Sequence, residues 1–202
     1  MKLFPVRIKK DTKIALIILL AVIAIYFLVQ YVVASVFVPD NFMEARKSSA
    51  AVSAEIISVL DESLKTLQTI SEHDQNYAFS PALKLVSAEI DRTKESKKKA
   101  TELTLALDKM ARAVPEISPS KARNLAVEAV SSAIALISHL VIYNDSLNGL
   151  LDTLRYKFSG DIRYDAKDVQ IMVQNMNREA KEINALNDLF NQKMREFDEA
   201  TK

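Results

Sequence analysis

The chain has 202 residues, a formal net charge of +1, two glycines, five prolines and no cysteine. The missing cysteine excludes disulfides, thiolate metal sites and a cysteine nucleophile. A net charge this close to zero predicts no nucleic-acid partner. Few glycines and prolines favour long helices over hairpins and irregular loops.

The first element is an apolar run from Ile14 to Val38 that contains no charged side chain. A helix of this length reaches about 37 Å, which is enough to cross a bilayer core of about 30 Å. The apolar region of a cleaved signal peptide has only about 7–15 residues. The sequence therefore predicts a retained transmembrane helix over residues 14–38.

The charges around this run predict its direction. Residues 1–13 hold five lysines or arginines and only one acidic residue, Asp11. Because positive charges stay on the cytoplasmic side, residues 1–13 are expected to form a basic cytoplasmic tail. Residues 39–202 would then be extracytoplasmic, so we expect a single-pass protein of the cell membrane with the lipid bilayer as its first partner.

Four long helical segments are predicted after the anchor. Each has apolar residues spaced three and four apart, which is the pattern of a helix with one buried face. Their expected bounds are about 41–75, 80–114, 118–159 and 162–200. Short connections make successive helices antiparallel. The predicted fold class is therefore all-α, an elongated up-down-up-down four-helix bundle with the near-parallel packing of coiled coils.

Local signals support these helix ends. Ser80-Pro81 and Ser118-Pro119 each offer a serine N-cap followed by proline at the first helical position. Gly160 is expected to end the third helix in a left-handed conformation.

The third helix contains fifteen residues, Ala129 to Tyr143, without a formal charge. This stretch is short for a second membrane span, and Glu128 adjoins it. We interpret it as a buried central helix of the bundle.

No catalytic, cofactor-binding or metal-binding residue is predicted. The two histidines are His73, in a polar turn, and His139, which is expected to be a core or boundary residue bonded to a neighbouring carbonyl. The Glu-x-x-His pair of di-iron bundles is absent, since Ile70 and Leu136 stand three residues before them. With no positioned acid, base or nucleophile, the sequence favours a protein that is not an enzyme.

The second predicted helix carries a basic stretch. Its members are Arg92, Lys94, Lys97, Lys98 and Lys99. The simpler interpretation is a solvated face with acidic residues interspersed, and the functional one is a docking patch for an anionic partner. We expect Lys97 or Lys94 to contact Asp61 or Glu62 of the preceding helix.

Aromatic residues gather near the two connections that the topology places farthest from the membrane. The candidate partner-binding tip consists of Tyr77, Phe79, Arg155, Tyr156, Phe158 and Tyr164. Tyrosine, phenylalanine and arginine are enriched at the centres of protein interfaces. The structural alternative is a small apolar cap that closes the open end of the bundle.

These observations predict a membrane-anchored helical bundle that acts as an interaction or scaffold component with a protein partner. The alternative is a ligand-sensing or accessory subunit of a membrane complex, which would need a concave site with convergent polar groups. Helices with this spacing could also complete their core between chains as a homo-oligomer. The layout is similar to that of bacterial chemoreceptor sensor modules and LemA-type proteins, but no family motif is matched and no family is assigned.

Overall fold

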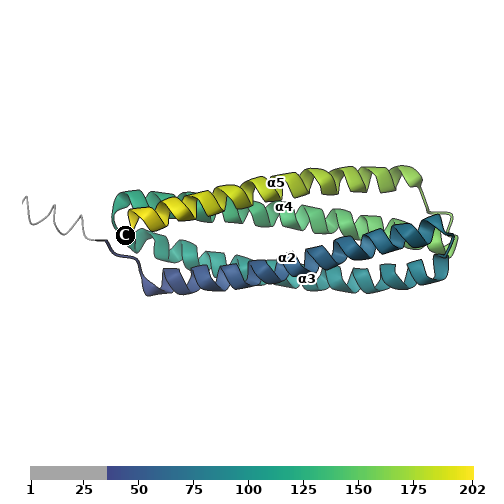
Figure 1. Ribbon diagram of the computed structural model, residues 1–202, viewed down its shortest axis with the longest axis horizontal. Coiled ribbons are helices and arrows are strands. Elements are labelled where there is room, and N and C mark those ends of the chain that lie inside the picture. Colours follow the sequence, from purple (N-terminus) through teal and green to yellow (C-terminus); the bar gives the residue numbers. More distant parts are fainter. Residues whose placement is uncertain (1–35) are drawn as a thin grey trace, which may run out of the picture.

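A computed structural model describes residues 36–202, which form four long helices (Figure 1). These are α2 (Asp40–Gln75), α3 (Phe79–Ala113), α4 (Ser120–Ser159) and α5 (Ala166–Ala200), with a 3-10 turn, η1 (Val114–Glu116), between α3 and α4. The predicted all-helical class is confirmed for this part of the chain. Residues 1–13 and most of the predicted anchor lie outside the described residues.

Successive helices run antiparallel along one long axis (Figure 1). α2 packs on α3, α3 on α4 and α4 on α5 along much of their lengths, whereas the backbones of α2 and α5 make little contact. Three of the four edges between helices are therefore closed by packing. The fourth edge, between α2 and α5, is left open.

The start of the described chain is held beside the junction of α3 and α4. Phe37 and Ser118 exchange two backbone hydrogen bonds, of 3.0 and 2.9 Å, in an isolated antiparallel bridge. Residues 36–38 are therefore extended, although the predicted span included them. We attribute this difference to the pairing with Ser118, together with Pro39, which precedes α2 and has no backbone N–H to continue a helix.

The helix ends follow local chemistry, with two exceptions. Asp165 caps α5 by accepting a 2.8 Å hydrogen bond from the Lys167 backbone. Gly160 ends α4 with a φ of 70°, as predicted. Ser80 is not an N-cap, because α3 begins at Phe79. Nor is Ser118, because its backbone pairs with the entering chain and α4 begins two residues later.

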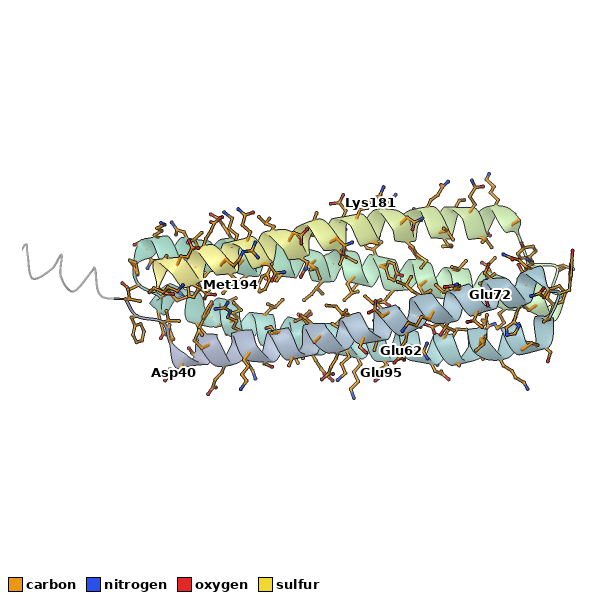
Figure 2. All side chains as sticks on the ribbon, viewed as in Figure 1. Asp40, Glu62, Glu72, Glu95, Lys181 and Met194 are labelled. Atoms are coloured by element: carbon orange, nitrogen blue, oxygen red, sulfur yellow. The ribbon has the colours of Figure 1, made fainter. Side chains whose placement is uncertain are left out.

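Burial is concentrated on the middle two helices. α3 and α4 supply most of the fully enclosed side chains, whereas α5 supplies four: Met176, Glu179, Met194 and Phe197. Figure 2 shows Met194 and Asp40 toward one end of the molecule and Glu72 toward the other. The interior is thus asymmetric, because α2 and α5 have fewer buried side chains than α3 and α4.

α4 packs against both α3 and α5, as a central helix should. It is also the one helix within residues 36–202 that is long and apolar enough to cross a membrane by length and composition. Only 33% of its most apolar 18-residue window is buried. The predicted buried central helix therefore keeps apolar side chains on its outer face.

A buried polar layer fixes α3 against α4. The Thr93 hydroxyl donates a 2.6 Å hydrogen bond to Asn148 Oδ1. One turn away, the fully enclosed Glu89 carboxylate accepts a hydrogen bond from Arg92. The bond between Thr93 and Asn148 favours one register of α3 on α4, because sliding the helices would break it. Glu89 and Arg92 both belong to α3, so their contact is kept in any register.

Candidate functional site: an apolar groove between α2 and α5

The open edge between α2 and α5 forms a groove of about 660 Å³ with mostly apolar walls. α2 contributes Ile57, Leu60, Leu64 and Leu67, and α5 contributes Val173, Met176 and Ile183. Leu140 and Leu150 of α4 form part of the floor. The two apolar stripes that a closed bundle would bury against each other therefore face a shared hollow.

A second hollow of about 410 Å³ extends the groove toward the start of α2. Both hollows are lined by Ser53, Ile57, Leu103, Leu136 and Asn187, so they adjoin each other. Along α2 the lining runs from Arg46 to Asp74. At 1.5 Å per residue this is about 42 Å, the length of a helix of many turns.

At the end of the molecule where α2 begins and α5 ends, these two helices are joined by side chains. The rings of Phe42 and Phe197 lie 5.3 Å apart and are almost fully buried. Arg46 makes a two-pronged contact with Asp198, with distances of 2.6 and 2.8 Å. The hydrogen bonds from Arg46 lower the pKa of the Asp198 carboxyl. We call these four residues the proximal clasp.

The groove walls expose large apolar side chains. Ile57 is 56% exposed, Leu64 is 55% exposed and Val173 is 40% exposed. Contiguous exposed apolar surface of this kind marks sites that another molecule covers. The chain as described leaves these side chains in contact with solvent.

Most of the polar residues that line the groove are uncharged, and three of them are amides. Asn177, Asn184 and Asn187 of α5 line it and are exposed. Asp61 of α2 also lines it, and no cation pairs with this carboxylate within residues 36–202. The rim can therefore donate and accept hydrogen bonds, and it carries one unneutralised negative charge.

The distal end of the groove continues into part of the predicted tip. Phe158 lines the groove and stacks on Phe79, with ring centroids 5.8 Å apart. Tyr77 meets Phe79 edge-on at 6.2 Å. We call Tyr77, Phe79 and Phe158 the aromatic mouth of the groove.

Tyr77 is an unusual residue for its place. Its φ is +55°, a left-handed conformation that a bulky residue rarely adopts. Its side chain is 82% exposed, so burial in the described chain does not offset this strain. Backbone strain of this kind is concentrated at functional sites.

The remaining tip residues form a second cluster around the connection between α4 and α5. The guanidinium of Arg163 lies 4.2 Å from the Tyr156 ring centroid, and that of Arg155 lies 5.9 Å from the same centroid. Lys157 lies over the Tyr164 ring and pairs with Asp74 of α2.

The structure thus brings all six predicted tip residues to one end of the molecule. Phe158 is only 7% exposed, which fits the alternative of an apolar cap for that residue. Tyr77 is open to solvent, and the binding role of the tip stays a prediction.

The predicted basic patch is largely neutralised by the molecule itself. Lys99 lies 2.6 Å from Glu55, and Arg92 lies 3.6 Å from Glu62. Of its five residues, only Lys98 has no acidic partner within the part of the chain that the structure describes. The arrangement favours the simpler interpretation, a solvated face with acidic residues interspersed.

The expected contact of Lys97 or Lys94 with Asp61 or Glu62 is wrong. Lys97 lies 2.8 Å from Asp145 of α4, and Lys94 lies 2.7 Å from Asp91 on its own helix. The physical reason is rotation about the helix axis. Arg92 and Lys99 occupy the side of α3 that faces α2, and this turns Lys97 toward α4.

His139 is a boundary residue, but its expected partner is wrong. Instead of a carbonyl, its Nδ1 donates a 2.7 Å hydrogen bond to Glu179 Oε2 of α5. The Glu179 side chain is 5% exposed. Hydrogen bonds from His139 and Arg178 lower the pKa of this carboxyl. The pair links α4 to α5 on the side opposite the contact of Lys97 with Asp145.

Sequence reasoning identified the apolar stripes but not the groove between them. The spacing of three and four places Ile56 of α2 and Met172 of α5 on the buried stripes. It misses their chain neighbours Ile57 and Val173, which line the groove. An apolar face wider than one buried stripe was the available signal. Periodicity alone does not say which molecule covers such a face.

Within residues 36–202, no three His, Cys, Asp or Glu side chains are grouped to hold a metal ion. The chain matches no protein-family model, no curated protein and no solved structure. The groove and its aromatic mouth are therefore the features from which function has to be argued.

Proposed function

We propose that this protein is a membrane-anchored interaction component whose extracytoplasmic helices capture an amphipathic helix of a protein partner in the α2–α5 groove. The apolar run over residues 14–38 supports the anchor, and the basic residues before it support the orientation. The groove is the observation on which the proposal rests. In this role the anchor fixes the protein to the membrane, and the helices present the docking site.

The shape and chemistry of the groove favour a helix as its occupant. A helix laid between two antiparallel helices buries a stripe of its own side chains, spaced three and four apart. The groove supplies about 42 Å of lining for such a stripe. Asp61 favours a lysine or arginine beside that stripe, and the amides of α5 can hydrogen-bond its polar edge.

A photo-crosslinking amino acid at position 57 or 64 of the full chain, in its native membrane, tests this proposal. These positions are two turns apart, about 10 Å along α2. If a helix lies along the groove, the two positions should attach to one partner at sites about seven residues apart. Mass spectrometry of the crosslinked peptides reads this spacing.

Leu105 of α3 provides the matched control. It is 61% exposed, like Leu64, but it does not line the groove. We expect Leu64→Glu to abolish the crosslink made from position 57 and Leu105→Glu to leave it unchanged. Equal crosslinking from positions 64 and 105, or no common partner from 57 and 64, would contradict a helix-binding groove.

The volume of the groove supports a second candidate function, the sensing of a small ligand. Ligand pockets are about 300–1,000 Å³ and are lined mainly by apolar side chains with a few polar groups, and the main hollow has about 660 Å³. Native mass spectrometry of the membrane-extracted protein separates the two functions. A bound small apolar molecule that Leu64→Glu removes, without any peptide crosslink, would favour sensing.

A further inference from the structure

The outer face of α4 carries an apolar stripe that the fold does not use. Val127, Ile134 and Val141 are 47%, 50% and 42% exposed and are spaced by seven residues. Ser131 and Ser138 lie between them on the same face and are also exposed. We call these five residues the α4 stripe.

The stripe is separate from both the interior and the groove. The neighbouring helices meet α4 on its two flanks, where Glu128 pairs with Lys193 of α5 and Asp145 pairs with Lys97 of α3. None of the five stripe residues lines the groove. The side chains of the α4 stripe therefore project away from the rest of the molecule.

We propose that the α4 stripe is the interface of a parallel homodimer, in which the stripe of one copy packs on the same stripe of a second copy. The seven-residue spacing places the stripe along the seam of two near-parallel helices. A two-fold interface of this kind brings like residues together, so Ile134 meets Ile134 of the second copy. The small serines let the two helices approach closely.

The charges near the stripe suit a second copy. Residues 129–143 carry no formal charge, so no like charges meet along the seam. The acidic residues at its two ends, Glu128 and Asp145, are neutralised by lysines 2.9 and 2.8 Å away. Between Val127 and Val141 a charged partner would find no unpaired charge to recognise. Arg123, one turn before Val127, bonds Ser120 and has no acidic partner within residues 36–202, so this cation lies at the edge of the stripe.

The parallel orientation rests on the membrane anchor of the proposed function, since copies in one membrane point the same way. An antiparallel pair centred on Ile134 would fit poorly, because α4 extends about 38 Å beyond this residue and only about 21 Å before it. In such a pair, the C-terminal end of α4 in each copy would extend about 16 Å past the N-terminal end of α4 in the other copy. Because α4 begins near the anchor, this extension would enter the membrane.

The size of the stripe predicts a membrane-dependent dimer. A standard protein interface buries about 800 Å² on each partner. The α4 stripe offers only three large apolar residues in each copy, so it is smaller than such an interface. Confinement in one membrane raises the effective concentration of the second copy. We therefore expect dimers in proteoliposomes and mostly monomers in dilute detergent.

Because the natural chain has no cysteine, single-cysteine variants test the interface directly. Helices packed 8–10 Å apart bring facing Cα atoms to roughly 4–5 Å, close to the range of a disulfide. In proteoliposomes, Val127→Cys, Ile134→Cys and Val141→Cys should each form a disulfide-linked dimer, of twice the 22.6 kDa chain mass, under mild oxidation.

Two comparisons make this test decisive. Leu105→Cys, on the outer side of α3, should crosslink at least about tenfold more slowly, and equal rates would indicate random collision and overturn the proposal. Crosslinking of Ile134→Cys but of neither valine variant would indicate an antiparallel pair and overturn it too, since like valines would then lie about 21 Å apart.

A charge variant gives an independent readout. Ile134→Lys places two like charges at the centre of the seam, and it should lower the dimer fraction roughly tenfold or more. Because Ile134 is half exposed, helicity and thermal midpoint should hardly change. An unchanged dimer would overturn the proposal. Groove crosslinking from position 64 is read separately, so failure of the groove and failure of the dimer are distinguishable.

Discussion

The α3–α4 pair and the α2–α5 pair are built from similar helical patterns, yet they differ in burial. α3 and α4 enclose most of the core and share a buried polar layer. α2 and α5 meet at the proximal clasp and leave large apolar side chains exposed along the rest of the groove. Stability is therefore expected to come mainly from the first pair, and binding from the second.

Of the changes that test this difference between the two pairs, breaking the proximal clasp should lower the free energy of unfolding the most. Phe197 is 1% exposed and packs on Phe42. Phe197→Ala leaves a cavity where α2 and α5 meet, and we expect it to lower the free energy of unfolding by about 3–5 kcal/mol. Urea unfolding measures the loss, and hydrogen exchange should quicken first in α5. A loss below about 1 kcal/mol would mean that the proximal clasp contributes little to the packing of α2 against α5.

A pair of leucines compares the two regions directly. Leu147 of α4 is fully buried, and Leu64 of α2 is 55% exposed in the groove. Leu147→Ala should cost about 2–5 kcal/mol, whereas Leu64→Ala should stay within about 0.5 kcal/mol. The same urea titration reads both. Equal losses would show that the groove is closed in solution and would remove the basis of the docking proposal.

The two distal connections differ in how they accommodate a left-handed residue. Gly160 has a φ of 70° and no side chain to strain, so Gly160→Ala should lower stability by about 1–2 kcal/mol. Tyr77 has a φ of 55° and is the bulky counterpart, so Tyr77→Gly should raise stability by up to about 1 kcal/mol. Thermal melts compare both variants with the natural chain. If Tyr77→Gly gained stability but lost partner crosslinking, the strained tyrosine would be serving binding.

The contact between His139 and Glu179 predicts a pH dependence. The pKa of Glu179 lies below its ordinary value of 4.5, chiefly because His139 donates a hydrogen bond to the carboxylate. Between the folded pKa and the ordinary pKa of Glu179, the unfolded chain binds more protons than the folded chain. The free energy of unfolding therefore falls as the pH drops from about 5 through the folded pKa. Glu179→Gln should flatten this part of the stability curve, which urea titrations at several pH values measure.

The pair of Asp161 and Arg163 gives the smallest effect. Hydrogen bonds from Arg163 lower the pKa of Asp161 from 3.8 to about 2. Its contribution is present above pH 3.8 and is lost as the pH falls toward 2. The pair joins residues two apart in an exposed turn, so Asp161→Asn should change the curve less than Glu179→Gln does. A larger change would show that this turn, and not the contact between α4 and α5, dominates acid sensitivity.

The sequence by itself determined the helical class and the approximate extent of each helix. Apolar residues spaced three and four apart require helices with one apolar face, and Gly160 ends a helix because it tolerates a left-handed conformation. The prediction that aromatic residues gather at one end followed from antiparallel order and short connections. These features depend on neighbours along the chain.

Only the tertiary structure decided which faces meet. It turned Lys97 toward Asp145, gave His139 a carboxylate of α5, and engaged Ser118 with Phe37. It also left the groove open and the outer face of α4 bare. A helical pattern states that a face is apolar, but the rotation and spread of the packed helices determine whether this chain or another molecule covers that face.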